Sequence, residues 1–217
     1  MKRVTLFAGH YGSGKTNIAV NYALKLHDEG KGVEIADLDI VNPYFRTKDS
    51  AEELERAGIN LISPSFANSN VDLPALPQEV YGLVQNHKKY AIMDIGGDER
   101  GALALGRYRQ FILDEGNYEM VFVVNFYRPL TRTAEEAYEV MLEIEAAGGI
   151  KFTSIVNNSN IGAETSKEDV LQSEKELERL CKITSLPVLF TSVKKDLEGE
   201  FEGKNILPLT LQKKIID

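Results

Sequence analysis

The chain has 217 residues, 43% of them hydrophobic and 27% charged, with a formal net charge of -8 at pH 7. This length predicts one α/β domain over residues 1–217, and the negative charge argues against broad binding to nucleic acid or stable binding to anionic membranes. The single cysteine excludes an intramolecular disulfide and a metal or iron–sulfur site built from several cysteines, and the lack of a signal-peptide or membrane-spanning apolar stretch favours a cytoplasmic protein.

Short apolar runs alternate with segments of helical periodicity along the chain. The runs lack the polar alternation of a strand with one exposed face, which favours buried parallel strands with helices on both sides. We therefore predict a three-layer α/β fold with a mainly parallel sheet of about seven strands, in which ligands bind at the carboxyl ends of the strands. The predicted strands are residues 4–8, 33–36, 59–62, 91–93, 120–124, 153–156 and 188–190.

A glycine-rich segment follows the first predicted strand. It fits the P-loop pattern of a glycine, four residues and Gly-Lys-Thr, and a segment with helical spacing comes next. Backbone N–H groups of such a turn surround a phosphate, Lys15 binds the β- and γ-phosphates, and the Thr16 hydroxyl binds Mg²⁺. The sequence therefore predicts a P-loop NTPase. The expected nucleotide ligands here are Gly9, His10, Tyr11, Gly12, Ser13, Gly14, Lys15, Thr16 and Asn17.

Three aspartates follow or end the second and fourth predicted strands. Asp37 and Asp39 lie on one side of an extended segment, because side chains alternate there. Asp94 ends an apolar strand and is followed by Gly96 and Gly97, which is typical of a Walker B element with Gly97 close to the terminal phosphate. Acidic residues also cap the turns that follow strands, so each aspartate has a structural alternative.

The order of P-loop, Asp-x-Asp and Asp-x-Gly-Gly resembles the MinD/ParA-type branch of P-loop ATPases, which also includes Mrp-type iron–sulfur carriers and dethiobiotin synthetase. The resemblance extends from residue 3 to about 193. It implies that Thr16 holds Mg²⁺, that Asp37 and Asp94 hold the waters of the ion, and that Asp39 orients the attacking water. The sequence leaves open which of Asp37 and Asp39 orients the water and which holds the waters of the ion. The resemblance further implies an ATPase whose slow hydrolysis drives a change of conformation or dimerisation.

The chain departs from this branch inside the P-loop. Dimerising members carry an extra lysine that reaches the partner's site, and here His10 and Tyr11 occupy the Lys-Gly positions. Histidine is a weaker replacement for a permanent cation at pH 7. Arg46 is the candidate for the missing catalytic charge, and its alternative is an ordinary surface arginine. The sequence therefore leaves open whether the protein forms an ATP-dependent homodimer.

The segment after the sixth predicted strand bears on the choice of base. Guanine-binding P-loop proteins place Asn-Lys-x-Asp there, whereas this chain has Asn157-Asn158-Ser159-Asn160, without the lysine or the carboxylate. Adenine is therefore favoured, with Asn157 and Asn158 expected to bind the base edge, since an amide both donates and accepts. The alternative is a turn-forming asparagine pair.

Two other classes of function remain open. One is an ATP-dependent small-molecule kinase, ligase or cyclase similar to dethiobiotin synthetase, with residues 63–77 and 101–109 forming the acceptor pocket. Arg100, Arg107 and Arg109 would bind an acidic substrate in that pocket, or else lie on an exposed helix face. The other is a nucleotide sensor that does not hydrolyse. The sequence identifies no partner protein, and residues 209–217 are expected to pack on the domain rather than bind a membrane.

Overall fold

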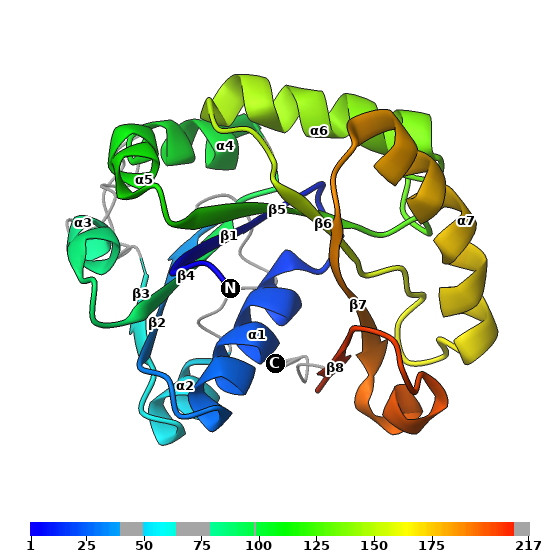
Figure 1. Ribbon diagram of the computed structural model, residues 1–217, viewed down its shortest axis with the longest axis horizontal. Coiled ribbons are helices and arrows are strands. Elements are labelled where there is room, and N and C mark those ends of the chain that lie inside the picture. The colour runs from blue at the N-terminus through cyan, green and yellow to red at the C-terminus, as the bar shows by residue number, and fades with distance from the viewer. Residues whose placement is uncertain (40–49, 64–78, 98, 211–217) are drawn as a thin grey trace, which may run out of the picture.

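The computed structural model describes residues 1–39, 50–63, 79–97 and 99–210, and for residues 99 and 100 it describes the backbone only. These residues form one eight-stranded sheet in the order β3-β2-β4-β1-β5-β6-β7-β8 (Figure 1). Every described pair of neighbouring strands is parallel. The strands are β1 Val4–Ala8, β2 Val33–Leu38, β3 Asn60–Ile62, β4 Tyr90–Ile95, β5 Tyr118–Val124, β6 Ser154–Asn157, β7 Val188–Lys194 and β8 Ile206–Leu209.

Helices cover both faces of the sheet, as Figure 1 shows. α1 and α2 lie on one face, and α3 to α7 lie on the other. Among the described helices, none combines the length and the apolar character needed to cross a bilayer. The bounds are α1 Lys15–Asp28, α2 Ala51–Arg56, α3 Glu79–Gln85, α4 Glu99–Gly106, α5 Arg109–Glu115, α6 Ala134–Gly148 and α7 Lys167–Thr184, with a 3-10 helix at Lys195–Glu200. The predicted three-layer α/β fold is thereby confirmed.

The central strand β1 contributes side chains to the two main hydrophobic cores, one on each face of the sheet. Its side chains are fully buried and alternate between the faces, so that Leu6 packs with α4 and α6 while Phe7 packs with α1. Tyr22 of α1 places its ring edge on Phe7, with centroids 5.4 Å apart, and stacks on Phe190 of β7 at 5.8 Å. These contacts hold α1, and with it the turn between β1 and α1, against the middle of the sheet.

The carboxyl end of β4 is held by a close backbone contact with α4. A Cβ atom on Gly101 would lie 2.4 Å from the Cα atom of Gly96, so no side chain fits at this contact. Gly96 in turn lies beside Asp39, whose Oδ1 would be 3.3 Å from a Cβ at position 96. The pair of glycines therefore brings α4, the end of β4 and the end of β2 together at the edge where a ligand is expected.

We expect Gly101→Ala to destabilise the protein by about 1 to 3 kcal/mol, because the added methyl group forces the two backbones apart. Gly82→Ala is the matched control, since Gly82 is also helical and a Cβ there would meet nothing within 4 Å. That control should be neutral or stabilising by up to about 1 kcal/mol, because alanine favours helix. Urea unfolding of both variants measures the difference. Equal midpoints would show that the contact between Gly96 and Gly101 is not tight.

Candidate nucleotide-binding site

The P-loop joins the buried strand β1 to helix α1. Gly12 and Gly14 have left-handed backbones, with φ of 76° and 87°, which favour glycine over other residues. Gly14 is the N-cap of α1 and provides no side-chain cap for the first N–H groups of the helix. A helix N-terminus with its N–H groups left to a ligand is a binding site for an anion. The predicted strand, glycine-rich turn and helix are confirmed in this order.

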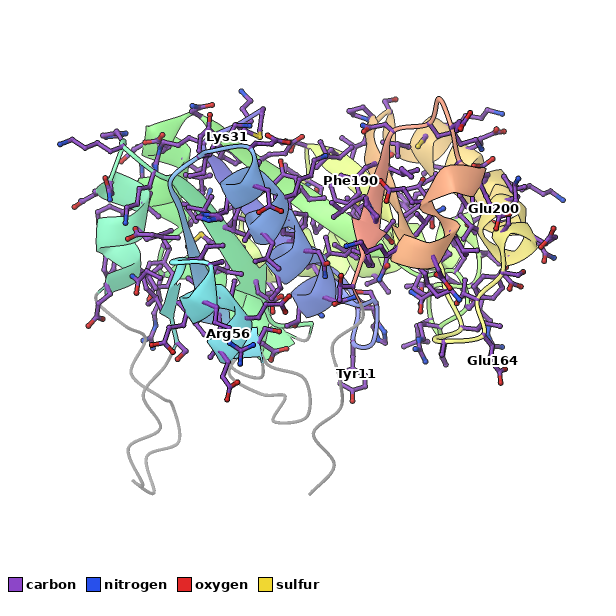
Figure 2. All side chains as sticks on the ribbon, turned by 90° about the horizontal axis from the view of Figure 1, so that it is seen from below. Tyr11, Lys31, Arg56, Glu164, Phe190 and Glu200 are labelled. Carbon is purple, nitrogen blue, oxygen red and sulfur yellow. The ribbon has the colours of Figure 1, made fainter. Side chains whose placement is uncertain are left out.

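A cavity of about 490 Å³ opens at this helix N-terminus, a volume within the usual range for a small-molecule site. Of the residues predicted from the sequence, it is lined by Tyr11, Gly12, Gly14, Lys15, Thr16, Asn17, Asp39 and Asn158. Further polar lining comes from the loops after β5 and β6 and from the end of β7, namely Arg128, Ser159, Asn160, Gly162, Thr165, Ser192 and Lys194. Tyr11 projects outward from the P-loop with 56% of its surface exposed (Figure 2).

Thr16 and the aspartates meet on the β4 side of the P-loop. The Thr16 hydroxyl donates to Asp94 Oδ2 at 2.6 Å. Asp37 lies directly opposite Asp94 in the register of β2 and β4, so the two side chains share one face of the sheet. Asp37 Oδ1 accepts a hydrogen bond of 2.9 Å from the backbone N–H of Asp39. All three aspartates are buried, and Asp39 among them lines the cavity.

The oxygen atoms of Thr16, Asp37 and Asp94 fit Mg²⁺. Two buried carboxylates side by side offer oxygen ligands to a cation, and Mg²⁺ binds such ligands while keeping several waters and the phosphates of its substrate. Within the described residues, no group of three or more His, Cys, Asp or Glu side chains is arranged to hold a metal ion. The ion would therefore take its remaining ligands from the nucleotide and from water.

Gly97 lies against the P-loop, where the sequence predicts contact with the terminal phosphate. A Cβ atom at this position would be 2.6 Å from Lys15 Nζ and 2.9 Å from the backbone nitrogen of Tyr11. Lys15 itself is buried, and its ammonium donates to the His10 carbonyl oxygen at 3.4 Å. Only glycine allows the end of β4 to approach the lysine so closely. Lys15, Thr16 and Gly97 therefore share one small region.

Asn157 and Asn158 are both buried and hydrogen-bonded within the protein. Asn157 donates to Ser173 Oγ at 2.8 Å and accepts from the Ser159 hydroxyl at 2.6 Å. Asn158 donates to the Ser13 carbonyl oxygen at 2.6 Å and accepts from the Ser192 hydroxyl. A Cβ on Gly14 would lie 2.2 Å from Asn158 Nδ2, so this amide lies directly on the P-loop. Their role in binding adenine stays a prediction, and the structure adds that Asn158 positions the P-loop.

Other predicted residues lie away from the cavity or outside the described residues. Arg46 falls in 40–49 and most of the predicted acceptor loop falls in 64–78, both outside the described part. Arg107 and Arg109 do not line the cavity, and Arg109 instead lies against the end of α6, with its Cδ 2.9 Å from a Cβ built on Gly149. Burial raises the pKa of the Cys181 thiol, which fits a packing residue better than a nucleophile.

Sequence reasoning missed Arg128, which follows β5 and lines the cavity beside Gly12. Its position could have indicated this role, because Arg128 follows the carboxyl end of a central strand, where ligands bind in a parallel sheet. It also missed the contribution of Ser192 and Lys194 at the end of β7, since that strand was expected to end at residue 190.

Among the comparisons with known proteins, the solved structures support the fold. No protein-family model and no curated protein matches the sequence. Among solved structures, the cell division protein FtsY of Thermotoga maritima has a TM-score of 0.60 at 17% identity over 89% of this chain and 62% of its own. The signal recognition particle receptor FtsY of Elizabethkingia anophelis has a TM-score of 0.56 at 16% identity over 98% of this chain and 63% of its own.

A third similar structure is the signal recognition particle 54 kDa protein of Aeropyrum pernix in complex with GDP, with a TM-score of 0.55 at 17% identity over 88% of this chain and 41% of its own. The chain thus spans less than two thirds of the length of each of these structures. Identities this low show a common fold and nothing finer. The matches do not support the more specific resemblance to the MinD/ParA branch. The chain has the fold of the P-loop NTPases.

Proposed function

We propose that this protein binds Mg²⁺ and ATP at the P-loop cavity and hydrolyses the nucleotide. The observation that carries the proposal is the cavity itself, which brings the N-terminus of α1, Lys15, Thr16 and Asp39 to one site beside Asp94. A generic glycine-rich turn would not explain why buried acidic groups from β2 and β4 converge on the same place. Phosphoryl transfer requires positioning and charge stabilisation, and these groups provide both.

Each residue has a separate task in this proposal. Backbone N–H groups of the P-loop and the Lys15 ammonium bind the phosphate chain, while Thr16, Asp37 and Asp94 hold the Mg²⁺ ion, which neutralises charge on the phosphates. Asp39 accepts a proton from the attacking water and aligns that water with the terminal phosphate. The structure favours Asp39 over Asp37 for this task, because Asp39 lines the cavity while the Asp37 carboxylate accepts the Asp39 N–H.

The proposal of ATP rather than GTP is supported by the polarity of the cavity. Apart from Asp39 at the phosphate end, no acidic residue lines it within the described part of the chain. Guanine has two donors on its Watson–Crick edge that need an acceptor, preferably a carboxylate. The walls from β6 and β7 instead carry Asn158, Asn160 and Ser192. The Aeropyrum protein was solved with GDP, but its similarity to this chain is one of fold and does not bear on the base that this chain binds.

Competition between nucleotides tests the base. We expect GTP to displace a fluorescent ATP analogue about tenfold or more less effectively than ATP, because unpaired buried donors cost about 1 to 3 kcal/mol. Titration of the analogue-bound protein with ATP, GTP and ITP gives the three affinities. Inosine carries the N1–H of guanine without its amino group and therefore isolates one of the two donors. Equal displacement by ATP and GTP would contradict adenine selectivity and favour a GTPase.

The finer proposal is a slow switch of the MinD/ParA type, in which hydrolysis needs no second substrate. It is supported by the order of the P-loop, Asp-x-Asp and Asp-x-Gly-Gly segments. A kinase or ligase would instead consume ATP only when its acceptor is present.

A further inference from the structure

We propose that Arg128 is a second cation of the phosphate site and binds the phosphate chain of the nucleotide through its guanidinium group. The P-loop pattern does not include this residue, which lies more than one hundred positions further along the chain. The inference rests on the proposed function, because it requires a nucleoside polyphosphate in this cavity. Arg128 would thus add a phosphate ligand to those of the P-loop and the Walker B segment.

The sheet places Arg128 beside the P-loop. β5 pairs with β1 from Val4↔Tyr118 to Ala8↔Phe122, so the loops that follow these two strands emerge next to each other. Arg128 lies in the loop after β5 and lines the cavity. A Cβ atom on Gly12 would lie 3.8 Å from Arg128 Nε and 3.9 Å from its Cδ, which is ordinary van der Waals contact. The guanidinium therefore lies against the turn whose N–H groups surround a phosphate.

The backbone that carries Arg128 is held by one buried and three partly buried hydrogen bonds. Asn125 Oδ1 accepts from the backbone N–H of Tyr127 at 3.0 Å and from that of Asn160 at 3.2 Å. The Asn125 amide also donates to the Asn160 carbonyl oxygen at 3.0 Å, and the Thr131 hydroxyl donates to the Asn125 carbonyl oxygen at 2.8 Å. The turn is thus tied to the loop after β6, which forms another wall of the cavity.

The same turn contains a strained residue. Leu130 has a φ of 65°, in the left-handed region that costs a branched, non-glycine residue about 1 to 2 kcal/mol. Its side chain is 62% exposed, so burial of Leu130 does not compensate for the strain. Pro129 fixes the chain between Arg128 and Leu130 and restricts the backbone of Arg128 to extended conformations. Strain of this kind is concentrated at ligand sites, where it holds a side chain in place.

The charges around the cavity leave Arg128 available for a ligand. Of the other lining cations, Lys194 donates to the Ala163 carbonyl oxygen at 2.9 Å, and Lys15 donates to that of His10. Between the described residues, the Arg128 guanidinium forms no hydrogen bond or ion pair. A nucleoside triphosphate brings several negative charges to a chain whose own net charge is -8. His10 lies where dimerising MinD/ParA-type ATPases carry a lysine, and a histidine is not a permanent cation.

A guanidinium suits this task because its planar donors bind two phosphate oxygens at once. We therefore expect Arg128→Ala to weaken binding of a fluorescent ATP analogue by roughly tenfold to a hundredfold, as for other hydrogen bonds between charged groups. Arg128→Lys should bind with intermediate affinity, because the charge remains while the fork is lost. Arg132→Ala is the matched control, since Arg132 is an exposed arginine from the same loop that does not line the cavity.

The measurement is a titration of the analogue into the wild-type protein, the three arginine variants and Lys15→Ala, each checked for folding by thermal unfolding without ligand. Weaker binding by Arg128→Ala, with Arg132→Ala within about twofold of the wild type, supports the inference. Equal affinity of Arg128→Ala and Arg132→Ala overturns it, even where Lys15→Ala shows that the P-loop site is real. If the wild type binds no nucleotide, the proposed function fails, and the inference fails with it. Should Arg128→Ala not fold, Arg128→Lys with wild-type affinity overturns the bidentate contact.

Discussion

Replacing Lys15 with alanine is expected to reduce ATP affinity at least about tenfold or to remove nearly all turnover. The ammonium is buried next to Gly97 and the P-loop backbone, where its attraction to phosphate is screened little by water. The backbone N–H groups of the P-loop remain in the variant, so the loss reports on the Lys15 side chain and not on the backbone of the loop. Equilibrium titration with a fluorescent ATP analogue and a steady-state phosphate assay measure the two quantities.

Lys25→Ala is the control for this experiment, because Lys25 is an exposed lysine near the other end of the same helix α1. It should leave affinity and turnover unchanged. If Lys15→Ala and Lys25→Ala bind and hydrolyse ATP equally well, the P-loop of this chain does not bind the phosphates and the assignment of the site is wrong.

Asp39→Asn is expected to lower turnover by roughly a hundredfold or more while leaving ATP affinity nearly intact. The amide keeps the shape of the side chain but accepts the proton of a water molecule poorly. Asp37→Asn should behave differently, because Asp37 faces Asp94 and would hold Mg²⁺, so its replacement should weaken Mg²⁺-dependent binding. Measuring kcat and nucleotide affinity at several Mg²⁺ concentrations separates the two effects.

The opposite pattern would show that the aspartates have exchanged roles. Unchanged turnover in Asp39→Asn together with a collapse in Asp37→Asn, at saturating Mg²⁺ and ATP, would place the attacking water next to Asp37. The geometry argues against this outcome, because Asp39 lines the cavity and Asp37 does not.

Much of the fold follows from local patterns in the sequence. Every predicted apolar run overlaps a strand of the structure, since buried parallel strands consist of short apolar segments. The edge strand β8, Ile206–Leu209, was not predicted because it has four residues and contains Pro208, which argues against a strand unless it lies at an edge. β7 extends four residues beyond its predicted end at 190, and these residues, Thr191 to Lys194, pair with β8.

In the site, features formed by neighbouring residues could be predicted from the sequence, whereas contacts between distant segments could not. The P-loop could be predicted because strand, glycines and helix are contiguous, and the aspartates could be predicted because parallel strands bring their carboxyl ends to one edge. The contact of Asn158 with Ser13, and that of Arg128 with Gly12, join segments more than one hundred residues apart. Such contacts depend on loop conformations that no short pattern specifies. The role of Asn157 and Asn158 at the base stays a prediction, and Arg46 lies outside the described residues.

Phosphate release from ATP tests the central claim most directly, with purified protein, Mg²⁺ and no added metabolite. We expect slow, steady release by the wild type that stops when EDTA removes Mg²⁺ and is nearly absent in Lys15→Ala. Release that appears only after an acceptor metabolite is added would favour the small-molecule enzyme. Release that is equal in the wild type, in Lys15→Ala and in EDTA, or absent from all three, would contradict a Mg²⁺-dependent ATPase at this P-loop.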